Sequence, residues 1–527
     1  MDERHEQRAV PQPTNEPSTP RTPSDPLAEE LLTDAASATA LQRHDDHRHH
    51  AAERLRRLRD HARKAVQPSP DDTTGTALLS SAEIDLRHAR GVLDLAARIA
   101  SAALGAGATA ADATAMVLRV THSYGLSVHV DVTLTSVTIS HFRSLESDPL
   151  TVLRTVRVQT VDHRKLELIE GLLDDLTTKD VALTQARHRI AEIIRTPKTY
   201  RRWVQTVAKA LLGLGVAALF GGNLADCLIA GLTTASVDLA VHGVDRIKAP
   251  AFFGQVAGAA VCGIVAILVM WGRAAPNTTV TASPSLIVAA GMVSMLSGLS
   301  LTTAARDAID GYVVTAAARL VEVVTLTGGI VLGLTMSLWV GLELGVPAYL
   351  SPSTGVSPVW WMQVLASGLI AVSFAVLNHL TPRSWALSAF FGLMTWMVAT
   401  FVGEWVGNAA ATAGAAAFVT GVVAQALNRV VRVPTIALVT AGVVPLVPGM
   451  SVYRGLLAVV QSSHGLEANA NAGMMLFQAA MVAVMLGAGV SLGIIAGRPL
   501  SMPSDWVTRL ALAKAWGRGR SGQSGSR

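Results

Sequence analysis

Two apolar stretches repeat a pattern of glycine, serine and proline that can interrupt a helix. The first is AGMVSMLSGLS, residues 290–300, and the second is AGVVPLVPGMS, residues 441–451. They share five of eleven residues at an offset of 151 (441 − 290). In the second copy, Pro445 and Pro448 lack the backbone N–H that a helix uses, and Gly449 loosens the chain. Carbonyl groups freed in an apolar medium need new partners, so such a break is expected only beside protein or a wet cavity.

A broken helix would bring charge-binding groups to the middle of a membrane. An N-terminal half-helix end favours a carboxylate, and unpaired carbonyls favour a cation or an ammonium group. The first copy has Ser294 and Ser297 at the two proline positions, so we expect the second copy to be broken and the first weakened. The alternative is a kinked, glycine-packed helix that binds no ligand. The predicted substrate-binding residues are Ser300, Arg306, Pro448, Gly449, Ser451, Tyr453 and Arg454.

Charged residues inside apolar segments are costly, so they mark candidate functional positions. Asp226, Asp238 and Glu322 lie in such segments and are the predicted ion-coupling residues, since a desolvated carboxyl can have its pKa raised towards neutrality. Arg454 could pair with Glu322 or Asp226, bind a substrate carboxylate, or extend its side chain to a membrane surface.

The segments that must position these residues are largely apolar. The chain has 527 residues, of which 50% are hydrophobic and 15% charged, against about 25% charged in an ordinary soluble protein. A helical span needs roughly twenty mostly apolar residues. Ten such runs are predicted, at 204–221, 224–242, 252–272, 284–303, 318–342, 359–378, 384–403, 406–426, 433–457 and 472–496. The predicted fold is therefore a mainly α, polytopic membrane protein.

Basic residues and the repeat together predict an inverted arrangement. With a cytoplasmic amino terminus, the outer side receives Arg273 and almost no other basic residue, which is the asymmetry typical of membrane proteins. The inner side receives Arg195, Lys198, Arg201, Arg202, Arg246, Lys248, Arg306, Arg319, Arg383, Arg429, Arg432 and Arg498. The two copies lie in the fourth and ninth runs and should run antiparallel. Ten transmembrane helices would form an inverted five-plus-five repeat, an architecture typical of secondary transporters, with both termini in the cytoplasm.

The sequence divides into membrane repeats and segments that are predicted to lie outside the membrane. Residues 1–80 are a disordered Pro- and His-rich head with a short basic helix at 51–64, and 81–202 are a small cytoplasmic α+β domain. Residues 203–345 and 359–500 are the two membrane repeats, 346–358 an extracytoplasmic linker and 501–527 a basic cytoplasmic tail. HDDHRHH, residues 44–50, could hold a metal ion, but nothing nearby would fix ligand geometry. We predict no metal site and no cofactor.

The α+β domain raises one alternative function, a membrane-tethered enzyme. Residues 81–202 show helical spacing at both ends and alternating apolar residues between, which predicts the order helix–helix–strands–helix–helix. His129, Asp131 and His141 lie on the predicted strands and suggest a hydrolase-like site. The domain has no nucleophile elbow, phosphate loop or metal-ligand spacing. A solvated sheet face is the simpler interpretation.

Three motifs resemble the threonine/serine exporter family of bacteria. They are LFGGNLADCLIAGL, LSGLSLTTAARDAIDGYVVTAAARLVE and PLVPGMSVYRGLLAVV, and the resemblance covers roughly residues 90–497. The matching positions are Phe220, Gly221, Gly222, Asp226, Gly298, Ser300, Arg306, Asp307, Glu322, Pro445, Pro448, Gly449, Tyr453 and Arg454. The resemblance implies a ten-span protein of the inner membrane that exports L-threonine and L-serine, driven by the proton motive force.

The predicted function is therefore secondary active export of small neutral amino acids. The broken second copy and Arg454 would hold the substrate carboxylate, and Asp226 or Glu322 would meet its ammonium group. The predicted partners are the amino acid, protons and the lipid membrane, with no nucleic acid, and a homo-oligomer is left open. A channel is a weaker alternative, because the sequence has no ring of like charges and no filter-like run of carbonyls.

Overall fold

The computed structural model describes residues 81–142, 148–156, 161–179, 181–274, 282–295, 298–346, 356–357, 359–431, 433–461 and 466–501. The predicted head, the tail beyond Ser501 and most of the predicted linker lie outside these residues, as does Ser297. The described residues belong to one compact unit, Leu79–Arg527.

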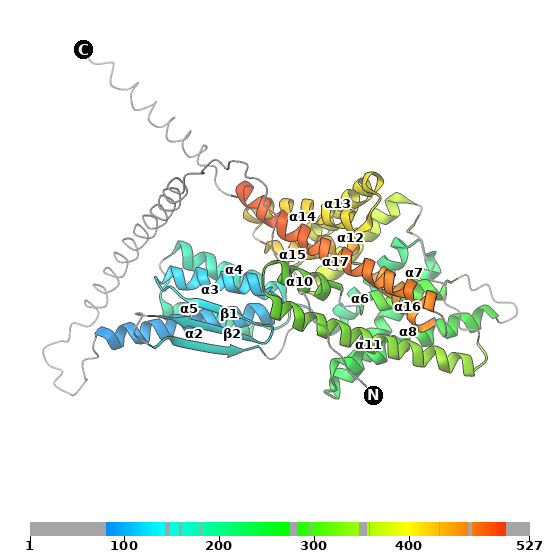
Figure 1. Ribbon diagram of the computed structural model, residues 1–527, viewed down its shortest axis with the longest axis horizontal. Helices are drawn as coiled ribbons and strands as arrows, with labels where there is room; N and C mark the ends of the chain where they lie inside the picture. Colours follow the sequence, from blue (N-terminus) through cyan, green and yellow to red (C-terminus); the bar gives the residue numbers. More distant parts are fainter. Residues whose placement is uncertain are drawn as a thin grey trace, which may run out of the picture. The chain divides into compact units, whose positions relative to one another are not determined.

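The first described elements form a small α+β group. In chain order they are α2 (Ser81–Gly105), α3 (Ala110–Ser123), β1 (His129–Val132), β2 (Ser136–His141), β3 (Leu150–Thr155), α4 (His163–Thr178) and α5 (Leu183–Arg195). The three strands are antiparallel in the order β1-β2-β3. Val137 and Ile139 alternate along β2 into a buried core. α2 packs on β2 and α3 on β1 (Figure 1). The order of elements is the one that the sequence predicts.

The rest of the described chain is a bundle of apolar helices. They are α6 (Arg202–Leu219), α7 (Leu224–Arg246), α8 (Ala251–Ala274), α9 (Pro284–Val293), α10 (Gly298–Ile309), α11 (Val313–Glu343), α12 (Trp360–Leu377), η1 (Pro382–Ser384), α13 (Trp385–Val406), α14 (Ala409–Val431), α15 (Thr435–Val443), η2 (Val444–Leu446), α16 (Gly449–Gln461) and α17 (Leu466–Ser501). Within the described residues, seven helices are long and apolar enough to cross a membrane, and the α15–α16 pair, bent by 46°, would make eight. The chain is thus a multi-pass membrane protein.

Two of the ten predicted runs fall outside even the larger set of eight. α6 carries Arg202 and Lys209 in its first turns, which lowers its hydropathy, and α9 has only ten residues. A short apolar helix can reach across a membrane only together with another segment, because each residue adds about 1.5 Å. α9 would therefore need the next helix of the chain, α10, to complete a span.

The helices α6–α11 and α12–α17 repeat one packing pattern. In the first group α6 contacts α7, α7 contacts α8, and α8 contacts α11; in the second, α12 contacts α13, α13 contacts α14, and α14 contacts α17 (Figure 1). α6 and α12 each have 18 residues, start 158 residues apart (360 − 202), and contact each other. The sequence repeat is therefore accompanied by a repeat of packing.

Both copies of the repeated pattern interrupt a helix, which goes beyond the weakening expected of the first copy. α10 begins at Gly298 and α16 at Gly449, again 151 residues apart (449 − 298). At the end of α9, the Ser294 hydroxyl donates to the Gly291 carbonyl at 2.6 Å, and the Met295 N–H donates to the Met292 carbonyl at 2.9 Å. Ser294 thus lies at the end of this helix, at the position that Pro445 occupies in the other copy.

Glycines let two equivalent helix pairs approach closely. A Cβ added at Gly333 of α11 would collide with the Val256 carbonyl oxygen of α8. A Cβ added at Gly493 of α17, 160 residues later (493 − 333), would collide with the Phe418 carbonyl oxygen of α14. Such small-residue contacts are the usual means of joining helices in lipid, where no hydrophobic force acts between them. They make α8–α11 and α14–α17 the tightest seams of the two halves.

Alanine at Gly333 or Gly493 should destabilise the protein by about 1–3 kcal/mol, because the seams have no space for a methyl group. Gly328 and Gly473 lie on the same two helices with nothing within 4 Å of an added Cβ. Alanine at these control positions should be neutral or slightly stabilising, because it favours the helix more than glycine does. Thermal unfolding of the four purified variants measures the difference. Equal melting temperatures in all four would contradict the proposed seams.

The α+β group is docked on the helix bundle through buried polar contacts. The backbone N–H of His163, the first residue of α4, donates to the Asn378 carbonyl at 2.9 Å. Its Nε2 lies 3.5 Å from the Thr440 hydroxyl on α15. On the other side, the Thr315 hydroxyl of α11 donates to the Val132 carbonyl at 3.3 Å. The group therefore touches helices from both halves.

The buried docking of His163 predicts a loss of stability in acid. Burial lowers the pKa of His163 from 6.5 to about 4, so the fold favours the neutral ring. Its contribution is fully present above pH 6.5 and decreases as the pH falls towards 4, by a total on the order of 3 kcal/mol. Melting temperatures between pH 7.5 and 5 should therefore fall less steeply in His163→Gln than in the wild type. The exposed His122→Gln serves as control, and a wild-type slope in His163→Gln would refute the assignment.

Candidate functional site

A cavity of about 170 Å³ lies where the two interrupted helices meet. Val293 and Ser294 at the end of α9 and Ser300 in the first turn of α10 line one side. The second interruption contributes Val444, Pro445, Val447 and Met450. Val293 and Val444 are equivalent in the repeat (444 − 293 = 151), and so are Ser294 and Pro445. The same positions of the two halves thus enclose the cavity.

The remaining wall comes from the first helix of each half. On α6 it consists of Leu212, Val216, Leu219 and the adjoining Phe220, and on α12 of Ile370, Phe374 and Leu377. The three α12 residues follow the first three α6 residues at a constant offset of 158 (370 − 212, 374 − 216 and 377 − 219). One face of each helix therefore forms an equivalent part of the cavity.

The cavity is apolar with polar groups at its edges. Its side-chain polar groups are the hydroxyls of Ser294 and Ser300, since the other lining residues are apolar. The interruptions add backbone groups, because the first N–H and last C=O groups of each half-helix have no partner inside the helix. Half-helix ends carry partial charges that favour an anion at the N-terminus and a cation at the C-terminus. The geometry suits a small zwitterion with a short side chain.

The two interruptions also touch each other directly. A Cβ added at Gly449, the first residue of α16, would lie 3.2 Å from both γ-carbons of Val293. The Tyr453 hydroxyl donates to the Ser285 carbonyl of α9 at 3.3 Å, and both residues are buried. α16 is therefore held against α9, so that movement of one interrupted helix is transmitted to the other.

Of the seven predicted substrate-binding residues, Ser300 alone lines the cavity. Pro448 and Gly449 are buried at the start of α16, beside the lining residues Val447 and Met450. Ser451 and Arg454 are half-buried on α16 and lie outside the lining. The predicted backbone break therefore lies at the cavity, whereas the predicted polar side chains other than Ser300 lie outside its lining.

The three predicted ion-coupling residues do not line the cavity. Asp226 accepts hydrogen bonds from the backbone N–H groups of Asn223 and Ser283, which joins the start of α7 to the start of α9. Asp238 forms ion pairs with Arg202 and Lys209. Glu322 is exposed on α11. Sequence reasoning missed the apolar lining residues; on α6 and α12 the available signal was their helical spacing of i, i+4 and i+7.

The residues of the alternative enzyme site do not converge. His129 and Asp131 are exposed on β1, where His129 pairs with Ser140 of β2. His141 follows Ser140 and therefore points to the opposite face of the sheet. It is buried, and its Nδ1 lies 2.6 Å from the Ser127 carbonyl. The three side chains thus cannot act on one substrate in this arrangement.

Comparison with known proteins identifies the family. The model described as "Putative threonine/serine exporter" matches residues 94–341, and the one described as "Threonine/Serine exporter, ThrE" matches residues 363–496. A "Probable threonine/serine exporter" of Mycobacterium tuberculosis (strain ATCC 25618 / H37Rv) is 31% identical over 440 residues, which cover 82% of this chain and 81% of that protein. The chain belongs to the threonine/serine exporter family.

A second relative within the threonine/serine exporter family comes from Corynebacterium glutamicum. This "Threonine/serine exporter" is 30% identical over 467 residues, covering 86% of this chain and 91% of its own. No solved structure matches the chain. The two family models leave unmatched the interval 342–362, which contains the predicted linker. The exporter family thus includes the α+β group together with both halves.

Arg306 and Asp307, which match the exporter family, lie where α10 meets the α+β group. Asp307 is fully buried; it pairs with Arg319 at 3.0 Å and accepts the Ala110 N–H, at the start of α3, at 3.3 Å. Arg306 lies 3.5 Å from Asp112 in the first turn of α3 and 3.6 Å from Asp310. Arg306 is predicted to bind substrate, but its ion pair with Asp112 gives it a structural role instead, because this pair joins α10 to the α+β group.

Asp307→Asn should destabilise the protein by about 3–5 kcal/mol, because it leaves the buried Arg319 guanidinium without its carboxylate. Arg119→Gln is the matched control, since the Arg119–Asp174 pair is solvent-exposed. It should cost about 0–1 kcal/mol. Denaturant unfolding of both purified variants measures the two changes. A small, equal change in both would show that Asp307 does not hold the interface.

Proposed function

We propose that the chain is a secondary active exporter that carries L-threonine and L-serine out of the cytoplasm across the bacterial inner membrane, driven by the proton gradient. The observation that carries this proposal is the cavity enclosed by equivalent residues of two halves, at the point where both halves interrupt a helix. In transporters built from repeats, the substrate site lies at the repeat interface near the middle of the membrane. The names of the two exporter relatives support the substrate class.

The cavity's chemistry supports a small hydroxylated amino acid. Val216, Ile370 and Val444 would surround the substrate's carbon atoms, and Ser294 or Ser300 would bond its hydroxyl. The carboxylate would meet the N-terminal ends of α10 and α16, and the ammonium group the carbonyls that end α9 and η2. This assignment replaces Arg454 with backbone groups as the proposed carboxylate site.

The proposed topology counts each interrupted pair, α9–α10 and α15–α16, as one span. Ten spans then form an inverted five-plus-five repeat, with the α+β group and both termini in the cytoplasm. Supporting this orientation, the α+β group contacts the end of α10 at Asp307, the start of α11 at Thr315 and the loop after α12 at Asn378. All three lie at ends that the positive-inside asymmetry assigns to the cytoplasm. Alternating access would come from rocking one half against the other.

Proton coupling is proposed to use a carboxyl whose protonation changes helix packing. A proton on Asp226 would weaken its hydrogen bonds to α9, and a proton on Asp238 would break its ion pairs to α6. Both α6 and α9 line the cavity. Glu322, exposed on α11, has no comparable connection within the described residues. Asp226 and Asp238 are therefore the stronger candidates of the three.

Transport by purified protein in liposomes tests the proposal. With an imposed proton gradient, the wild type should move labelled threonine and serine. Val216→Trp would fill the cavity and should reduce transport at least about tenfold, a loss equivalent to about 1.4 kcal/mol. Leu211→Trp, on the exposed side of the same helix, should stay within about twofold of the wild type.

Two controls make the transport result decisive. Both tryptophan variants must elute and melt like the wild type, which separates a blocked cavity from a misfolded protein. No threonine or serine movement by the wild type would refute the substrate class. Transport by Val216→Trp at the wild-type rate would instead remove the cavity from the mechanism.

A further inference from the structure

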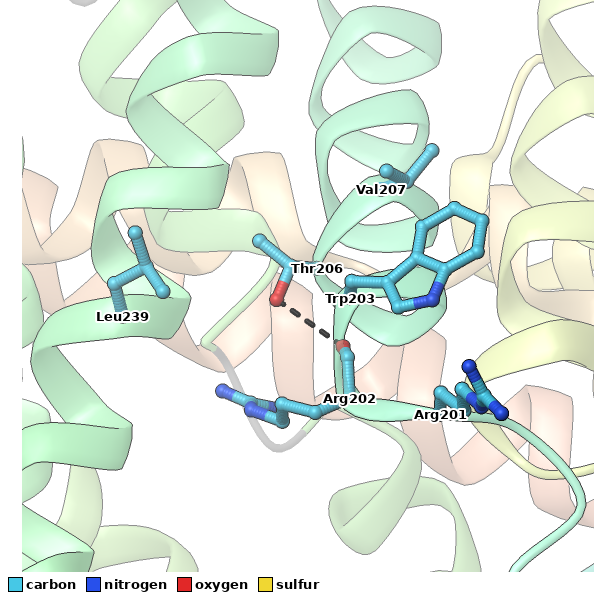
Figure 2. A pocket seen from close by; sticks show the side chains of 6 residues that line it. All are labelled: Arg201, Arg202, Trp203, Thr206, Val207 and Leu239. Atoms are coloured by element: carbon cyan, nitrogen blue, oxygen red, sulfur yellow. Dashed lines mark hydrogen bonds between the residues drawn. The ribbon is translucent and has the colours of Figure 1, made fainter.

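An open groove lies beside the first turns of α6, away from the substrate cavity. Its volume is about 650 Å³, and Figure 2 shows its lining residues. They are Arg201, Arg202, Trp203, Thr206 and Val207 from the start of α6 and Leu239 from α7. The two arginines lie where α6 begins, and Val207 lies further along the helix (Figure 2).

The walls of the groove are exposed apolar side chains. Trp203, Val207 and Leu239 are 65%, 47% and 59% exposed. α7, which carries Leu239, is one of the helices apolar enough to span a membrane. Exposed apolar side chains on such helices contact lipid chains, and tryptophan is favoured at the level of the lipid headgroups. The groove therefore extends from the headgroup level into the hydrocarbon.

The mouth of the groove has a surplus of positive charge. Asp238, 1% exposed, binds Arg202 at 2.6 Å and Lys209 at 2.7 Å. Arg201 is exposed, and its side chain makes no ion pair or hydrogen bond within the part of the chain that the structure describes. Two cations thus share one carboxylate and Arg201 adds a third positive charge near the start of α6, so the surplus suits an anion.

One of the groove's arginines, Arg202, is held in position before any ligand arrives. The Thr206 hydroxyl donates to Asp238 at 2.8 Å and to the Arg202 carbonyl at 3.3 Å. The second of these bonds is dashed in Figure 2. Although Arg202 is paired, 39% of its side chain stays exposed. An anion that binds there therefore meets a guanidinium whose conformational entropy is already reduced.

We infer that this groove binds an anionic phospholipid. The lipid phosphate lies at the start of α6, within reach of Arg201 or Arg202, whose side chains extend to opposite sides of the helix (Figure 2). One acyl chain runs along Trp203, Val207 and Leu239. A soluble phosphate ester would use the arginines and leave the apolar walls uncovered. A zwitterionic lipid would cover the walls and gain less from the surplus charge, since its amine is repelled.

The groove is connected to the proposed transport cavity by α6. The helix carries the groove residues in its first turns and the cavity residues Leu212 and Val216 two to three turns later. Bound lipid would therefore restrain the helix that forms one cavity wall. This consequence rests on the proposed function, whereas lipid binding itself does not.

Lipid binding to the purified full-length protein tests the inference without any transport. Native mass spectrometry would compare phosphatidylglycerol, phosphatidylcholine and glycerol 3-phosphate as probes. Phosphatidylglycerol should bind at least about fivefold more tightly than phosphatidylcholine, because each nearby arginine contributes about that factor. Arg201→Gln should weaken phosphatidylglycerol binding by about the same factor, while Arg246→Gln, which removes an exposed arginine elsewhere on α7, should leave it within about twofold.

Leu239→Gln tests whether the groove binds a whole lipid or only its headgroup. This variant should weaken phosphatidylglycerol binding with Arg201 intact, because it removes apolar wall. An equal loss of phosphatidylglycerol affinity in Arg201→Gln and Arg246→Gln would overturn the inference, because it would show that binding depends only on the general positive charge of the surface. Binding of glycerol 3-phosphate as tight as that of the lipid would overturn it too. A stable dimer that Leu239→Gln abolishes would place a second copy of the chain in the groove instead.

Discussion

The structure depends on one constraint: a helix can be interrupted inside an apolar medium only where its freed backbone groups meet protein or a polar cavity. Two interruptions, at Val293–Gly298 and Val443–Gly449, satisfy it together. Gly449 packs on Val293, and the cavity opens beside this contact. Each interrupted helix packs against the other, so both interruptions lie at the interface of the two halves. The cavity lies at this interface for the same reason.

The remainder of each half provides a frame for these interruptions. α8 packs on α11 and α14 on α17 along glycine seams that leave no space for a side chain. α6 and α12 contact each other and contribute matching faces to the cavity. Tight seams resist relative sliding, because a close backbone contact has one good register. The two halves meet at the α6–α12 contact and at the interrupted helices, where Tyr453 of α16 binds α9.

The buried carboxylates of the described residues connect helices to one another, and no charged side chain lines the cavity. Asp226 joins α7 to α9, Asp238 joins α7 to α6, and Asp307 joins α10 and α11 to the α+β group. A buried charge is costly until something pairs with it. The sequence shows that a carboxylate in an apolar segment is costly, and it therefore predicts ion coupling for Asp226 and Asp238. It does not show whether a ligand or a neighbouring helix pairs with each carboxylate. The partners Ser283, Arg202 and Lys209 come from other helices, so only the folded chain identifies them.

The sequence by itself determined the features that depend on local order. Apolar runs predicted the helices, proline and glycine predicted the break before Gly449, and alternation predicted the strands of the α+β group, because each is a property of neighbouring residues. Only the tertiary structure decided that Ser294 also ends its helix, that Leu212 and Ile370 face one cavity, and that Arg306 lies at the α+β group. These features depend on which helix faces are brought together, and an apolar helix has no polar side from which that choice could be predicted.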